Sequence, residues 1–174
     1  MALFIIINNS KLSILKARNY LGIAKIKLGA LNFDHPLVRK KHRLPSKKNV
    51  RRLRNVFERA GCERLEKENF INAVVDDAAL ISSLAFSGLN KQRFRQLQEG
   101  DSIPFVDLRS VDCLGGLHRI EAAKEFLDDN DQWWIVRLFS KGEPVYLSVS
   151  LLQLRIYCRS PTNSPYEDDR RILE

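Results

Sequence analysis

The sequence has few cysteines and no long apolar run. It has only three cysteines among 174 residues, and no Cys-x-x-Cys pair occurs. An odd number of widely spaced cysteines is typical of reduced thiols, so we expect an intracellular protein. No apolar run approaches the roughly 20 residues that cross a bilayer, so we expect no membrane partner. The length fits one domain with a sizeable core.

Acidic residues are missing from one long basic segment. Residues 39–54, RKKHRLPSKKNVRRLR, contain nine Lys or Arg and no Asp or Glu, while the whole chain has a formal net charge of +8. Such a segment attracts phosphates and polyanions, although many charge runs are only solvated surface. RKKHR also matches a nuclear-localisation patch, which favours the nucleus over the cytoplasm. We assign candidate nucleic-acid contacts to Arg39, Lys40, Lys41, Arg43 and Arg54.

Hydrophobic periodicity and turn residues predict a single mixed α/β domain, with a small mixed sheet and flanking helices. We expect this domain at residues 20–140, between an N-terminal extension (1–19) and a diverging C-terminal segment and tail (141–174). The apolar stretch after residue 141 fits a further strand or a further helix. The predicted elements are, in chain order, a strand at 20–31, a helix at 49–60, a strand at 69–77, helices at 78–86 and 91–99, a strand at 103–111, a helix at 118–127 and a strand at 133–140.

Local signals set the ends of these helices, and periodicity sets their buried faces. The expected N-terminal caps are Asn49, Asp76 or Asp77, and Asn90, with Gly61 and Gly100 as stops. The expected apolar face of the first helix comprises Val50, Leu53, Phe57 and Ala60, and its basic residues lie mostly around the other side.

The stretch DCLGGLHRIEAA, residues 112–123, joins a predicted strand to a predicted helix. A helix N-terminus exposes unpaired N–H groups that favour anions, and glycines let the backbone approach a ligand closely. We therefore predict a phosphate-binding turn, which we call the phosphate seat, at Gly115, Gly116, His118 and Arg119. The planar guanidinium of Arg119 would donate two hydrogen bonds to the phosphate. The alternative is a purely structural turn. Further charge from the first helix would come from Lys47, Lys48, Arg51 and Arg52.

GGLHRIEAA resembles the nucleotide-binding box of the ParB/sulfiredoxin superfamily. ParB-like domains have a Gly-x-Arg-Arg-type turn at this place and sulfiredoxins have Gly-Gly-Cys-His-Arg. In both, the turn and the helix N-terminus hold the phosphates of a nucleoside triphosphate, and LPSKKNVRRL resembles the first helix of that fold. The resemblance implies a ParB/sulfiredoxin-like domain that binds a nucleoside triphosphate with Mg²⁺.

A closer resemblance is to an uncharacterised family abundant in filamentous fungi, including on giant mobile elements. Its members carry a Cys-Leu-x-Gly-x-His-Arg-Ile box and then a Trp-Trp strand, and residues 25–140 follow that pattern. The matching positions are Asn49, Leu53, Phe57, Gly61-Cys62, Cys113-Leu114, Gly116, His118-Arg119 and Trp133-Trp134.

Two departures from these patterns limit what the resemblance implies. Leu117 stands where sulfiredoxins have their nucleophilic cysteine, and a leucine cannot attack a sulfinic acid, so we expect no sulfiredoxin activity. Cys113 is expected to be a buried apolar side chain instead. ParB proteins also need a helix-turn-helix domain to read DNA sequence, and this chain has no room for one. A truncated or divergent copy is an open alternative.

Other candidate groups are weaker. The histidines His35, His42 and His118 are not at metal-ligand spacing, so we expect no metal site. The acidic group Asp128, Asp129 and Asp131 fits either a Mg²⁺ site near a nucleotide or a solvated loop. Because neighbours on a strand alternate sides, one of Trp133 and Trp134 should pack inward and the other could offer a stacking surface.

Three functional hypotheses follow. The first is a triphosphate-binding module with a basic surface that works as a slow nucleotide switch, linked to DNA or mobile-element biology. The second is a non-specific nucleic-acid-binding protein in which the glycine turn is structural. The third is a non-functional truncated copy, which predicts an exposed apolar patch where the missing part belonged. No dedicated general base is evident, so whether the chain is an enzyme stays undecided.

Overall fold

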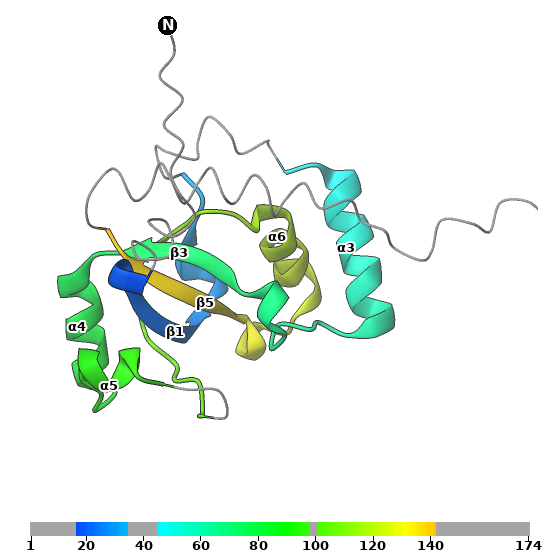
Figure 1. Cartoon of the computed structure of the whole chain (residues 1–174). Coiled ribbons are helices and arrows are strands. Elements are labelled where there is room, and N and C mark those ends of the chain that lie inside the picture. The colour runs from blue at the N-terminus through cyan, green and yellow to red at the C-terminus, as the bar shows by residue number, and fades with distance from the viewer. Residues whose placement is uncertain (1–16, 35–44, 98–100, 142–174) are drawn as a thin grey trace, which may run out of the picture.

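Five strands form one mixed sheet in the computed structural model, which describes residues 17–34, 45–97 and 101–141 (Figure 1). The strand order is β1-β5-β3-β4-β2. β1 pairs with β5 and β3 with β4 antiparallel, whereas β3 with β5 and β2 with β4 are parallel. The predicted mixed α/β domain with flanking helices is confirmed. The strands are β1 Tyr20–Lys27, β2 Leu31–Asn32, β3 Ile71–Val75, β4 Val111–Cys113 and β5 Trp133–Ser140.

Four helices flank this sheet: α3 packs beside α6, and an ion pair between Asp77 and Lys91 joins α4 to α5 (Figure 1). They are α3 Lys47–Ala60, α4 Asp77–Phe86, α5 Lys91–Arg95 and α6 Leu117–Phe126. Single 3-10 turns occupy Leu28–Ala30, Lys67–Asn69 and Asp129–Asp131. No helix in the described ranges is long and apolar enough to cross a membrane.

The helices gather on one face of the sheet, which we call the helix face. Cross-strand partners share a face, so the register places Trp134, Val136 and Leu138 of β5 on the helix face with alternate residues of β1 and β3. Three contacts tie the helices to it: Phe57 of α3 with Trp134, Gly116 at the start of α6 with Ile71, and Phe94 of α5 with Gly22.

Several predicted caps are confirmed. The Asp76 carboxylate accepts from the N–H groups of Ala78 and Ala79, and the Asn90 side chain accepts from Arg93 N–H. Gly61 ends α3 with φ of +81°, a conformation that favours glycine. The first helix begins at Lys47 and not at Asn49, and its N-cap is Ser46.

Other predicted boundaries were wrong. The strand expected at 20–31 breaks into β1, a 3-10 turn and β2. The strand expected to end at Val111 begins there, because residues 104–106 pair only with Lys25 at the edge of β1. The helix expected at 91–99 ends at Arg95. Ala60 is exposed, so the buried face of α3 comprises Val50 and Phe57, with Leu53 half-buried.

Candidate functional site

The starts of α3 and α6 lie against each other. The backbone N–H of Ser46 donates to Nε2 of His118 over 3.1 Å. Nε2 is therefore the acceptor in this hydrogen bond. The Ser46 side chain makes no capping hydrogen bond. His118, a predicted phosphate ligand, thus connects the glycine turn to the first turn of α3.

The two glycines of the turn have different surroundings. Gly116 is the N-cap of α6 and has φ of +91°. A Cβ there would lie 2.8 Å from Cδ1 of Ile71, so both the backbone conformation and the close packing favour glycine. A Cβ at Gly115 would meet nothing within 4 Å. Close packing against β3 therefore accounts for the second glycine, and open space lies beside the first.

Arg119 reaches across the end of the sheet. Its Nη1 donates to the carbonyl oxygen of Asn69 over 2.9 Å, and Nε1 of Trp134 donates to the same oxygen over 2.8 Å. These two bonds hold the residues just before β3 against α6 and β5. At least one donor of the predicted phosphate seat is thus used within the fold.

The outer side of α3 carries a group of exposed side chains, four basic and one an amide, that we call the basic stripe. It faces away from Val50 and Phe57 and lines a surface depression of about 380 Å³. Its members are Lys47, Lys48, Arg51, Arg52 and Asn55, all of them exposed. No carboxylate occurs among these described lining residues. The structure therefore brings together the four cations predicted on the first helix.

The predicted cations outside the basic stripe are placed differently. Arg54 lies at the side of α3, where its Nε pairs with Glu58 over 3.1 Å. The remaining predicted contacts, Arg39, Lys40, Lys41 and Arg43, lie outside the described residues. His118, Arg119 and the glycines are likewise not among the described residues that line the depression. The predicted phosphate seat and the basic stripe are therefore two neighbouring features.

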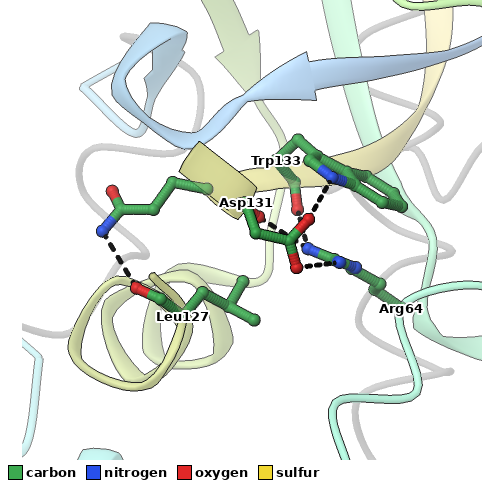
Figure 2. A network of polar contacts seen from close by, with 5 residues as sticks. Arg64, Leu127, Asp131 and Trp133 are labelled. Atoms are coloured by element: carbon green, nitrogen blue, oxygen red, sulfur yellow. Dashed lines mark hydrogen bonds and ion pairs between the residues drawn. The ribbon is translucent and has the colours of Figure 1, made fainter. Parts of the chain in front are cut away.

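A cluster around Trp133 was not found by sequence reasoning (Figure 2). Figure 2 shows the Asp131 carboxylate between the Arg64 guanidinium and the Trp133 indole, whose Nε1 donates to Asp131 Oδ1 over 2.8 Å. Arg64 also donates to the backbone oxygen of Asp131 over 2.7 Å and stacks on the Trp133 ring at 3.6 Å. The Lys25 ammonium lies 4.8 Å from the centre of that ring.

This cluster bears on two predicted roles. Hydrogen bonds from Arg64 hold the pKa of Asp131 below its usual range, so this carboxylate is engaged by an arginine. In the described parts of the chain, no group of three His, Cys, Asp or Glu residues is placed to hold a metal ion. Trp134 packs inward, as one tryptophan was expected to, and Trp133 stacks on arginine. The sequence pattern gives no signal that pairs Arg64 with a residue 67 positions away.

Burial raises the thiol pKa of both described cysteines. Cys113 is fully buried at the end of β4, and burial strongly raises the pKa of its thiol, which fits the expected apolar role. Burial also raises the pKa of Cys62, with Arg64 acting in the opposite direction. Leu117 stands at the first position of α6, between the turn and His118.

The comparison with known families extends over most of the chain. Residues 19–155 match the model described as the N-terminal domain of a protein of unknown function, DUF3723. The chain belongs to the DUF3723 family. The expected membership of an uncharacterised family is confirmed at that level. No curated protein and no solved structure matches it.

Proposed function

We propose that this DUF3723 domain binds the phosphodiester backbone of nucleic acid through the basic stripe of α3. The observation that carries the proposal is the grouping of four exposed cations and one amide around a depression with no described carboxylate. Lys and Arg that are not paired with acids can neutralise phosphates and release the counterions condensed on nucleic acid. Arg54 lies outside this group and is already paired with Glu58.

The glycine turn has a structural role in this proposal. Gly116 lets α6 start close to β3, His118 accepts from the start of α3, and Arg119 bonds the backbone before β3. Together these contacts support α3 from behind, so that its basic side faces solvent. Binding of this kind is electrostatic and independent of base sequence. A nuclear location would fit it.

A test removes the charge without unfolding the helix. In the stripe variant, Lys47, Lys48, Arg51 and Arg52 are replaced by Gln, which has a similar helix propensity. The control variant carries four such changes at exposed cations outside α3: Lys27, Arg93, Arg109 and Lys124. Both variants lose the same net charge. A labelled 20-base-pair duplex should bind the parent and the control variant and lose affinity for the stripe variant. Equal losses in both variants would reject the proposal.

A second candidate is the binding of a nucleoside triphosphate with Mg²⁺ at the glycine turn, as in the ParB/sulfiredoxin superfamily. It is supported by the meeting of two helix starts at Ser46 and His118, and by the open space beside Gly115. It requires His118 and Arg119 to exchange their present partners for phosphate oxygens. Thermal-shift titration with ATP, CTP and GTP tests it, since a ligand at about a hundred times its Kd adds about 2.7 kcal/mol. Loss of the shift in Arg119→Ala would support this candidate.

A further inference from the structure

The outer side of α3 places one amide between two rows of cations. At about 100° of rotation per residue, Lys47 and Arg51 form a first row along the helix. Lys48 and Arg52 form a second row beside it. Asn55 projects between the two rows, about one turn further along. All five residues are exposed and line the same depression, so each can contact a ligand that lies along α3.

The Asn55 amide is available for a ligand. Within the described part of the chain, its side chain forms no hydrogen bond. Past Asn55, the exposed Arg59 continues the second row. Glu58 follows the first row, and its carboxylate pairs with Nε of Arg54 over 3.1 Å. The only acid of α3 is therefore neutralised by a neighbouring arginine and does not oppose an anion along the two rows.

The dimensions of α3 match the major groove of duplex DNA. The helix has 14 residues, so it is about 21 Å long and, with its side chains, about 10–12 Å across. It lies at one side of the domain, beside α6 (Figure 1). A major groove about 12 Å wide admits such a helix between the phosphates of the two strands. Each row of cations would then face one strand, and the amide would face the base edges.

Other forms of nucleic acid fit this side of α3 less well. Proteins that bind single strands stack the bases on aromatic side chains. The only aromatic residue of α3 is Phe57, which is buried against the core. An A-form RNA duplex has a deep, narrow major groove that side chains do not read. The shape and chemistry of α3 therefore favour B-form duplex DNA.

We infer that α3 enters the major groove of duplex DNA and that the Asn55 amide contacts base edges there, with adenine as the preferred base. The amide nitrogen donates to N7 of adenine, and the amide oxygen accepts from its N6 amino group. This inference rests on the proposed binding of nucleic acid by the basic stripe. It adds a base preference to phosphate contacts that have none.

Titration with three ligands of the same base sequence tests the choice of duplex DNA. The ligands are a DNA duplex, an RNA duplex and a DNA single strand, each labelled and measured at low salt with the full chain. The DNA duplex should bind at least about tenfold more tightly than the other two. Equal or tighter binding of either competitor would overturn the inference. The proposed function is judged separately, since it fails only if the stripe variant and the control variant behave alike.

A pair of matched variants tests the base contact. Asn55→Ala removes the amide from α3 and raises helix propensity, and Gln92→Ala removes an exposed amide from α5. The ligands are an A·T duplex and the same duplex with 7-deazaadenine, which lacks the N7 acceptor but keeps its base pairing. This replacement should cost the parent and Gln92→Ala about tenfold in affinity, whereas Asn55→Ala should bind both duplexes equally. Equal binding of both duplexes by the parent, or a tenfold loss that persists in Asn55→Ala, would overturn the base contact.

Discussion

Helices α3 and α4 have similar inner faces and opposite outer faces. Each buries two large apolar side chains, Val50 and Phe57 in α3 and Leu80 and Leu84 in α4. The outer face of α3 is the basic stripe. The outer face of α4 exposes Phe86 at 94% and Ile81 at 50%. Both helices bury a similar apolar face in the core. The difference between them lies in the side chains that they expose to solvent.

The truncated-copy hypothesis predicts an exposed apolar patch, and the structure does not test that hypothesis. A scattered apolar side chain on a surface is ordinary, and α4 has two large ones. The basic stripe needs another explanation, because a missing domain does not call for four exposed cations on one helix side. The two hypotheses therefore concern different helices, α3 and α4, and each can be tested separately.

The largest expected effects lie on the inner faces, where the two helices should behave alike. Phe57 packs against Phe126 and Trp134 with ring centres 5.8 Å and 6.3 Å apart, and Leu84 is fully buried. Phe57→Ala should lower the free energy of unfolding by about 3–5 kcal/mol and Leu84→Ala by about 2–5 kcal/mol. Urea denaturation measures both. A cost below about 1 kcal/mol at either site would show that its helix is not docked as described.

The next effect concerns the turn that supports α3. Gly116→Ala should cost about 2 kcal/mol, because its φ of +91° is strained for alanine and its Cβ would press on Ile71. Gly115→Ala is the matched control, with open space for the methyl group, and should cost less than about 1 kcal/mol. Similar costs at the two glycines would contradict the described packing against β3.

A smaller effect is expected at the Arg64–Asp131 pair. Asp131→Asn should cost about 1 kcal/mol at pH 7, since half of this carboxylate is exposed and the ion pair is screened. The folded pKa of Asp131 lies below its ordinary value of 3.8, so its stabilisation is present above that pH and is lost as pH falls through the folded pKa. Stability of the parent should therefore fall more steeply than that of the variant below about pH 4. Parallel curves in acid denaturation would exclude the pair as a source of stability.

The smallest effect is expected on the outer face of α4. Ile81→Lys replaces a half-exposed apolar side chain and should change the free energy of unfolding by no more than about 0.5 kcal/mol. Val56→Lys on α3, with a closely similar exposure of 45%, is the reference. A loss above about 2 kcal/mol at Ile81 alone would mean that this face is covered in solution. Thermal melts of both variants provide the measurement.

Local signals in the sequence were sufficient for most elements of the fold. The side chains of Asp76 and Asn90 bond to helix N–H groups within three residues, so their capping roles are visible in sequence. The start of β4 was not predictable. This strand has only three residues, and they pair with strands that are distant in sequence. The break in the strand after Lys27 likewise depends on which neighbour each part pairs with.

The candidate site likewise has one part that the sequence predicts and one part that it does not. The basic stripe follows from helical spacing, because positions 47, 51 and 55 repeat every four residues on one side of a helix. The contacts of His118 with Ser46 and of Arg119 with Asn69 join residues 72 and 50 positions apart. Such partners depend on the packing of α6 against α3 and the sheet, which composition and periodicity do not specify.

The salt dependence of duplex binding tests the role of the basic stripe most directly. A plot of log K against log salt concentration for the parent should have a slope near −3.6, about −0.9 for each of four neutralised phosphates. The control variant should keep that slope, and the stripe variant should bind weakly with a slope close to zero. A parent with no measurable binding at low salt, or a stripe variant with the parent's slope, would contradict the assignment of nucleic-acid binding to the outer face of α3.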